Sequence, residues 1–150
     1  MQKITSCLWF DKNAEEAANF YVSVFKNSKI TSKFKNQAEN PSQMPVGSVL
    51  VVHFELDGEE FMALNGGPYF KFNEAVSFVV KCKDQEEIDY YWEKLSAVPE
   101  AEQCGWLKDK FGLSWQVVPE NMEELVKTEK AMKAMLDMKK IIIKDLQNAN

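Results

Sequence analysis

Asn13-Ala14-Glu15-Glu16-Ala17-Ala18-Asn19-Phe20-Tyr21 recurs further along the chain as Asp84-Gln85-Glu86-Glu87-Ile88-Asp89-Tyr90-Tyr91-Trp92. Each stretch opens with an Asn or Asp that can cap a helix, and a Glu three positions later completes a capping box. The apolar positions then match at the spacing i, i+3, i+4, i+7, which predicts one buried helical face in each copy. The matched pairs are Ala17 with Ile88, Phe20 with Tyr91, Tyr21 with Trp92 and Val24 with Leu95. An internal duplication on this scale determines the fold class.

The repeat extends into strands on both sides of each helix. Residues 4–10 and 75–82 are strand-like runs that lead into the two helices. After each helix a glycine turn precedes another strand with apolar residues at matching offsets: Phe61 and Leu64 after Gly58, Trp115 and Val118 after Gly112. Residues 36–47, polar and with two prolines, are extra in the first copy and predict a mobile loop. The repeating unit is therefore a strand, a helix and two or three strands; the alternative is chance similarity of two amphipathic helices.

Three further motifs resemble one protein family. They are Cys7–Asp11 (CLWFD), Leu64–Asn73 (LNGGPYFKFN) and Cys104–Gln116 (CGWLKDKFGLSWQ). With the paired βαβββ unit, they resemble the PhnB-like branch of the vicinal oxygen chelate superfamily, often labelled a 3-demethylubiquinone 3-methyltransferase domain. That superfamily includes glyoxalase I, bleomycin-resistance proteins and extradiol dioxygenases. The resemblance covers about residues 4–119 and implies an α+β fold in which two βαβββ modules form a curved half-barrel sheet.

We expect a single domain over residues 1–150, with module one at about 1–66, module two at about 74–119 and a C-terminal helical extension at 120–150. Within the extension, Asn121 and Glu124 form a third capping box. Residues 127–140 are helix-like, with Met132, Met135 and Leu136 on one face, whereas residues 141–143 are three isoleucines that favour extended structure. This apolar tail packs on its own chain or on a partner subunit. The resemblance implies a homodimer.

Length and composition bound the protein class. A chain of 150 residues buries about 68–70% of its unfolded surface, which is enough for a hydrophobic core without stabilising disulfides or metals. No apolar run approaches about 20 residues, so no membrane-spanning segment is expected. The start MQKITS has no hydrophobic signal region, which predicts a cytoplasmic location. Three cysteines without CxxC spacing indicate reduced, buried thiols.

The charge pattern narrows the class of partner. All 18 basic residues are lysine, so an anion site would use ammonium groups or backbone N–H groups and never a guanidinium fork. The net charge of -5 argues against nucleic acid, whose partners carry basic stripes, and against anionic membrane surfaces.

The resemblance implies four metal-ligand positions, two in each module. One lies early in the first strand and one lies on the last strand, four residues after the turn glycine. The last-strand positions are Met62 and Gln116, and the first-strand positions fall near Ile4 or Thr5 and near Ser77. Divalent metals at such sites prefer His or carboxylate ligands, and none of these residues supplies them. We therefore expect no metal at these positions and no cofactor.

His53 is the only histidine and lies in a predicted strand two residues before Glu55. A period of two places both side chains on one face. If that face lines a cavity, His53 is a candidate general base and Glu55 its orienting partner. The alternative, which we favour, is a half-exposed histidine on a sheet.

Cys104, Trp106 and Lys108 share a strand face by parity. A nucleophilic cysteine needs a base or a positive neighbour, and Lys108 is such a neighbour for Cys104. A buried, inert thiol is the alternative, and we favour it.

The candidate ligand-binding residues are aromatic or amide side chains on or at the ends of predicted strands: Trp9, Asn65, Trp106, Trp115 and Gln116. A set of tryptophans can wall an apolar pocket, and it can equally form plain core. Asn65 opens the turn Asn65-Gly66-Gly67-Pro68, whose N–H groups are either an anion cradle or simply a chain reversal that needs φ > 0.

Three functions remain open from the residues and the resemblance. The first, which we favour, is a protein that binds a small apolar or aromatic molecule without the usual metal, its ligand unidentified. The second is an enzyme that uses the same cleft, through His53 with Glu55 or an unorthodox metal site. The third is a dimeric interaction module. The methyltransferase label has no support in the motifs, since no GxGxG follows a strand.

Overall fold

A computed structural model describes residues 2–150 and divides the chain into two compact units. The first unit ends at Lys71 and the second begins at Phe72. Each unit contains one small mixed sheet, of four strands in the first and three in the second, so the fold class is α+β. Below, "module one" denotes the first unit and "module two" the second unit as far as Pro119.

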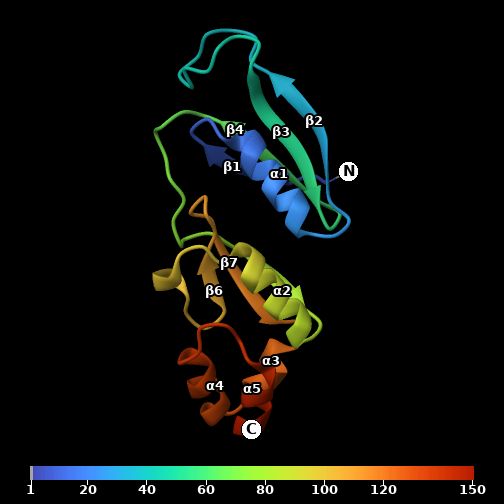
Figure 1. The fold of residues 1–150 in the computed structure, drawn as a ribbon, viewed down its shortest axis with the longest axis vertical. Coiled ribbons are helices and arrows are strands. Elements are labelled where there is room, and N and C mark those ends of the chain that lie inside the picture. The colour runs from blue at the N-terminus through green and yellow to red at the C-terminus, as the bar shows by residue number, and fades with distance from the viewer. Residues whose placement is uncertain (1) are drawn as a thin grey trace. The chain divides into compact units, whose positions relative to one another are not determined.

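Module one is a βαβββ unit. Its elements are β1 (Ser6–Phe10), α1 (Ala14–Val24), β2 (Lys29–Lys35), β3 (Val49–Leu56) and β4 (Glu59–Asn65). The strands lie in the order β1-β4-β3-β2, with β1 parallel to β4 and the other neighbours antiparallel. Figure 1 shows α1 lying along one face of this sheet.

The core of module one forms where α1 meets the sheet. Ala17 and Ala18 are fully buried, and their small side chains let the helix approach the strands closely. Tyr21 stacks on Phe54 of β3 with ring centroids 6.3 Å apart. Because side chains alternate along a strand, the odd-numbered residues of β3 point away from α1 and form the open face of the sheet.

Module two repeats the unit with one strand fewer. It contains β5 (Ser77–Cys82), α2 (Gln85–Leu95), the 3₁₀ turn η1 (Pro99–Ala101), β6 (Trp106–Lys108) and β7 (Ser114–Pro119). The order is β5-β7-β6, with β5 parallel to β7 and β6 antiparallel to it. The predicted βαβββ pattern is therefore βαββ here. Pro99 starts η1 where the second strand would lie, since proline cannot donate to a strand ladder.

The duplication predicted from the sequence is confirmed in the backbone. Helices α1 and α2 have eleven residues each and begin at the matched positions. Gly58 and Gly112 both adopt positive φ, at 85° and 86°, in the turns before β4 and β7. Such φ values favour glycine, which explains why both copies carry it.

The predicted capping boxes form in only one of three places. Asp84 accepts a hydrogen bond from the N–H of Glu87 at 2.9 Å, and the carboxylate of Glu87 accepts from the N–H of Lys83. Asn13 and Asn121 make no side-chain cap, so the prediction is wrong for both. At the start of α1, the last residue of β4 caps the helix in place of Asn13, as described below.

Residues 36–47 form a loop, as predicted, but one with its own hydrogen-bond network. Asn36 is buried, and its Nδ2 donates to the carbonyl of Met44 at 2.8 Å. Its N–H donates to Ser48 and its carbonyl accepts from Gly47, which closes the base of the loop. The hydroxyl of Tyr69 donates to Pro41 from outside. These bonds give the loop a defined hydrogen-bonded conformation, and its mobility stays a prediction.

The C-terminal extension forms α3 (Met122–Leu125), α4 (Glu129–Leu136) and α5 (Ile143–Ala149). Leu125, Ile141 and Leu146 are buried together as its core, with Met135 and Met138 packed against them. The tail therefore packs within its own chain. Residues 141 and 142 are non-helical as expected, whereas Ile143 begins α5, a helix that the sequence did not predict. No helix among residues 2–150 is long and apolar enough to cross a membrane.

Candidate functional site

The sheet of module two has one face packed on α2 and one open face. Leu107, Trp115 and Val117 point toward α2 and are buried. The residues between them point to the open face and pair across the strands in three rows. The rows are Lys108, Ser114 and Ser77; Trp106, Gln116 and Val79; and Val118 with Lys81. We call this surface the module-two face.

Gln116 and Ser77 contact each other on the module-two face. The Nε2 of Gln116 donates to the Oγ of Ser77 at 3.0 Å. The resemblance had compared both positions with metal ligands, and they do lie together. Their donors are a neutral amide and a hydroxyl, however, which suit a divalent transition metal poorly. The Oε1 of Gln116 accepts no hydrogen bond from residues 2–150.

A pocket of about 330 Å³ opens beside β6. Trp106, Lys108 and Ser114 of the module-two face line it, together with Leu107 of β6 and residues that precede β6 in the chain: Glu74, Val98, Glu100 and Ala101. It lies next to η1, on the edge of β6 that has no strand neighbour. The strand missing from module two thus leaves room for this pocket.

An ion pair and a buried hydroxyl mark this pocket. The Nζ of Lys108 lies 2.8 Å from the Oε1 of Glu74, and this hydrogen-bonded ammonium lowers the pKa of the Glu74 carboxyl. Ser114 is 1% exposed, and its Oγ has no hydrogen-bond partner among residues 2–150. Buried hydroxyls usually have a partner, which makes this one notable.

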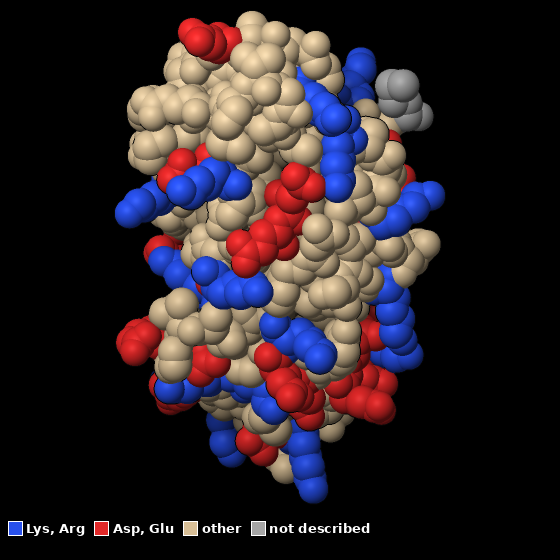
Figure 2. Space-filling model, turned by 45° about the horizontal axis from the view of Figure 1, so that its top comes forward, with Lys and Arg blue, Asp and Glu red and all other residues tan. Residues whose placement is uncertain are grey.

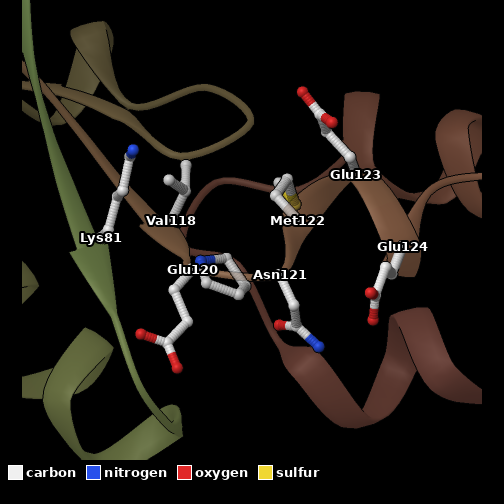
Figure 3. A pocket seen from close by; sticks show the side chains of 8 residues that line it. Lys81, Val118, Glu120, Asn121, Met122, Glu123 and Glu124 are labelled. Carbon is white, nitrogen blue, oxygen red and sulfur yellow. The ribbon is translucent and has the colours of Figure 1, made fainter.

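A second pocket of about 390 Å³ lies at the other end of β7, where the extension begins. It is lined by Lys81, Val118, Pro119, Glu120, Asn121, Met122, Glu123 and Glu124. Figure 3 shows Lys81, Val118, Met122 and Glu123 projecting to the same side, whereas Glu120 and Glu124 point away from it. The lining mixes charged groups of both signs with an apolar floor.

His53 and Glu55 lie on the open face of module one, as predicted. They alternate with the buried residues Val52, Phe54 and Leu56. His53 pairs with Met62 on β4, and Met62 pairs with Cys7 on β1. In the described part of the chain, the imidazole has no hydrogen bond to Glu55 or to any other residue. The catalytic role of the pair stays a prediction.

Trp9 anchors the segment that leads out of module one. Its Nε1 donates to the carbonyl of Gly67 at 2.9 Å, and its ring meets Phe70 edge-on at 4.9 Å between centroids. A Cβ on Gly66 would clash with the indole of Trp9, so only glycine fits there. Gly67 has φ of 99°, as a chain reversal requires. The indole of Trp9 therefore has its N–H bonded to Gly67 and its ring packed against Phe70.

Asn65 holds helix α1. Its Oδ1 accepts from the N–H of Ala14 at 2.9 Å, and its Nδ2 donates to the carbonyl of Val49 at 2.9 Å. The first N–H groups of a helix lack intrahelical partners, and Asn65 satisfies one of them from β4. This buried amide acts in place of the expected Asn13 cap. Its ligand-binding role stays a prediction.

Trp115 belongs to the core of module two. Its Nε1 donates to the Oδ2 of Asp109 at 2.8 Å, and both residues are buried. The Oδ1 of Asp109 accepts from the N–H groups of Phe111 and Leu113. Sequence reasoning missed Asp109. The available signal was an Asp three residues before Gly112, a spacing typical of a turn in which Asp bonds its own backbone.

Cys104 lies in the turn before β6, with φ of 39°, and not in the strand. The predicted parity of Cys104 with Trp106 and Lys108 is therefore wrong, because the left-handed backbone breaks the alternation. Burial raises the pKa of the Cys104 thiol, which is opposite to the activation that a nucleophile needs. All three thiols are free, and Cys7 is exposed rather than buried.

Comparisons with known proteins agree with this architecture. A family model described as 3-demethylubiquinone-9 3-methyltransferase matches residues 2–118. The PhnB protein from Bacillus cereus is 38% identical, covers 78% of this chain and 99% of its own, and has a TM-score of 0.64. A protein from Pseudomonas aeruginosa, 16% identical, covers 79% of this chain and 98% of its own with a TM-score of 0.59, which shows the fold alone. No curated protein matches.

The match to the family model ends before the C-terminal extension, which is therefore an addition to the family domain. The two modules carry the repeated unit, the glycine turns and the open sheet faces. The chain belongs to the PhnB-like 3-demethylubiquinone-9 3-methyltransferase family.

Proposed function

We propose that this chain binds a small apolar or aromatic molecule on the module-two face. The observation that carries the proposal is the juxtaposition of the half-buried Trp106 ring with Gln116 on the sheet face turned away from α2, beside a pocket of about 330 Å³. Ligand sites are typically mainly apolar with a few convergent polar groups, and volumes of about 300–1,000 Å³ are usual.

The chemistry of the face favours a neutral, flat ligand. Trp106 offers a ring on which an aromatic molecule stacks, and Val79 and Val118 extend the apolar surface. The Oε1 of Gln116 is an acceptor for one hydroxyl or N–H group of the ligand. Lysines and carboxylates are interspersed over the surface seen in Figure 2.

We place the chain in the vicinal oxygen chelate superfamily on the support of its repeated module. The positions that correspond to metal ligands carry a thioether at Met62, an amide at Gln116 and a hydroxyl at Ser77. This donor set does not fit the divalent transition metals that His and carboxylate ligands hold. The proposed binding therefore uses no metal at these positions.

The test is a fluorescence titration with N-phenyl-1-naphthylamine, a neutral aromatic probe that brightens in apolar surroundings. We expect saturable binding that weakens about tenfold in Trp106→Ala, because the stacking surface is removed. Tyr90→Ala is the matched control, since it removes an aromatic ring from the exposed side of α2. Equal affinities for the two variants would rule out the module-two face.

A second arm uses thermal unfolding with added Zn, Ni, Mn and Fe(II). A ligand at a hundredfold excess over its Kd stabilises the native state by about 2.7 kcal/mol. We expect the apolar probe, and none of the metals, to raise the midpoint. A rise with a metal at stoichiometric occupancy would contradict the proposal and indicate chemistry on a chelated substrate.

A further inference from the structure

The C-terminal extension is bonded to the turn that leads into Trp106. The N–H of Cys104 donates to the carbonyl of Met138 at 2.6 Å, and the N–H of Gly105 donates to Lys139 at 2.8 Å. The side chain of Gln103 also donates to the carbonyl of Leu136. Three consecutive residues before β6 are thus held by the last residue of α4 and by the segment that joins α4 to α5.

Gln85 holds the same segment from the other side. Its Nε2 donates to the carbonyl of Ile141 at 2.9 Å, and its Oε1 accepts from the N–H of Ile143 at 2.8 Å. Lys140 forms an ion pair with Asp89 at 2.8 Å, and this ammonium lowers the pKa of the Asp89 carboxyl. Figure 1 shows α3 and α5 beyond the end of module two at which α2 begins.

Ile141 packs against the turn itself. It is fully buried, and a Cβ added to Gly105 would lie 3.3 Å from its Cγ1. The extension therefore contacts Gly105 through both backbone and side chain. Because Leu125 and Leu146 bury Ile141 from within the extension, its position depends on the packing of all three helices.

The turn is a conformation that needs such support. Cys104 has φ of 39°, a left-handed backbone conformation that is unfavourable for a residue with a side chain. Gly105 has φ of 90°, and its carbonyl accepts a hydrogen bond from the N–H of Val117 at 2.8 Å. The backbone just before Trp106 is consequently fixed by β7 on one side and by the extension on the other.

We propose that the C-terminal extension positions Trp106 for ligand binding, with Gln85 and Ile141 as the positioning residues. The inference rests on the proposed function, since Trp106 is the aromatic surface of that site. The match to the family model ends at residue 118, so the segment that holds Trp106 in place lies outside the matched family domain. Its effect is to narrow the range of ring orientations and thereby the range of ligands accepted.

The test is fluorine NMR of the full chain labelled with 5-fluorotryptophan. The chain has four tryptophans, and Trp106→Phe identifies the signal of Trp106. Gln85→Met keeps the side-chain length and removes both hydrogen bonds to the extension. Ile141→Ala removes the packing on Gly105. Gln147→Met, at an exposed position of α5, is the matched control.

We expect the Trp106 signal to shift or broaden in Gln85→Met and in Ile141→Ala, whereas it stays unchanged in Gln147→Met. Trp9, in module one, serves as the internal reference. By the clamp we mean the hydrogen bonds of Gln85 to Ile141 and Ile143. Hydrogen exchange at the N–H of Ile143 verifies that the clamp has opened, with an expected loss of protection of at least about tenfold. An unchanged Trp106 signal in a variant whose clamp has opened would overturn the inference.

This readout separates the two proposals, because the signal of Trp106 is observed without any ligand. If the naphthylamine probe fails to bind the wild type, the proposed function fails while the NMR result still decides the positioning role. If the probe binds, we expect Gln85→Met to weaken binding about fivefold, with Gln147→Met at wild-type affinity. A moved signal with an unaltered affinity would overturn the role in binding.

Discussion

Asp109 accepts the indole N–H of Trp115 at 2.8 Å while its other carboxylate oxygen accepts two backbone N–H groups. The carboxyl group is fully buried, so these donors take the place of solvent as its hydrogen-bond partners. It joins the turn after β6 to the core that α2 covers. The paired strands that carry Trp106 and Gln116 therefore depend on one buried acidic residue.

Replacing that carboxylate should destabilise module two. Asp109→Ala leaves the indole N–H and the N–H groups of Phe111 and Leu113 without their buried acceptor, and each unpaired group costs about 1–3 kcal/mol. We expect a loss of about 3 kcal/mol or more in the free energy of unfolding, measured by urea denaturation. Asp11→Ala, at an exposed position, should lie within about 0.5 kcal/mol of wild type. Equal midpoints for the two variants would contradict the role of Asp109.

The cap of α1 offers a direct comparison of sequence and structure. Asn65→Ala removes both the bond to Ala14 and the bond to Val49, and it should cost about 2 kcal/mol. Asn13→Ala should cost less than about 0.5 kcal/mol, because Asn13 makes no side-chain cap. Asp84→Ala, which removes the equivalent cap of α2, should cost about 1 kcal/mol. If Asn13→Ala proved the costlier of the two asparagine changes, the assignment of the cap would be wrong.

His53→Ala distinguishes binding from catalysis. His53 lies on module one, outside the module-two face, so the affinity for the naphthylamine probe should remain within about twofold of wild type. If the protein is instead an enzyme that uses His53 as a base, turnover of its substrate should fall by about 10²–10⁴-fold. The measurement is a titration of the variant beside wild type, with Glu55→Gln as the companion change.

The three thiols should differ in reactivity. Cys7 is exposed and should react first with a disulfide reagent at pH 8, whereas Cys82 is buried and should react only on unfolding. Partial desolvation of its sulfur raises the pKa of Cys7 although the residue as a whole is exposed, and burial together with the charge of Glu87 raises the pKa of Cys82 to about 12. Since the thiolate is the reactive form, the rate at Cys7 should be below that of free cysteine and should climb as the pH rises toward 9. Cys7→Ser should abolish the fast phase.

Linkage at Cys82 gives a pH dependence of stability. When the pKa of a thiol is higher in the folded state, its contribution to the free energy of unfolding is fully present below the pKa that the thiol has in the unfolded chain. That contribution is lost as the pH rises above this value, because the unfolded chain then releases the proton first. We therefore expect a loss between about pH 9 and pH 12 that is absent in Cys82→Ala. Urea midpoints across this range, compared between the two proteins, provide the measurement. Parallel curves would show that Cys82 does not contribute.

The repeated elements were predictable because local rules govern them. The apolar spacing within 14–24 and 85–95 decides helix and buried face together, and Gly58 and Gly112 mark turns that need positive φ. Strand alternation also placed His53 and Glu55 on one face. In each case the residues that determine the element are neighbours in sequence, so the local sequence pattern is enough to predict it.

The sequence alone thus determined the duplicated α+β architecture, the strand position of Trp106 and the poor fit of Met62 and Gln116 to a metal. Only the tertiary structure decided that Asn65 caps α1, that Asp109 holds Trp115, that module two lacks a strand and that the extension holds the turn at Gly105. These features join groups from different elements. A buried polar group takes whichever partner the packed chain brings within hydrogen-bond distance, and sequence spacing does not reveal that partner.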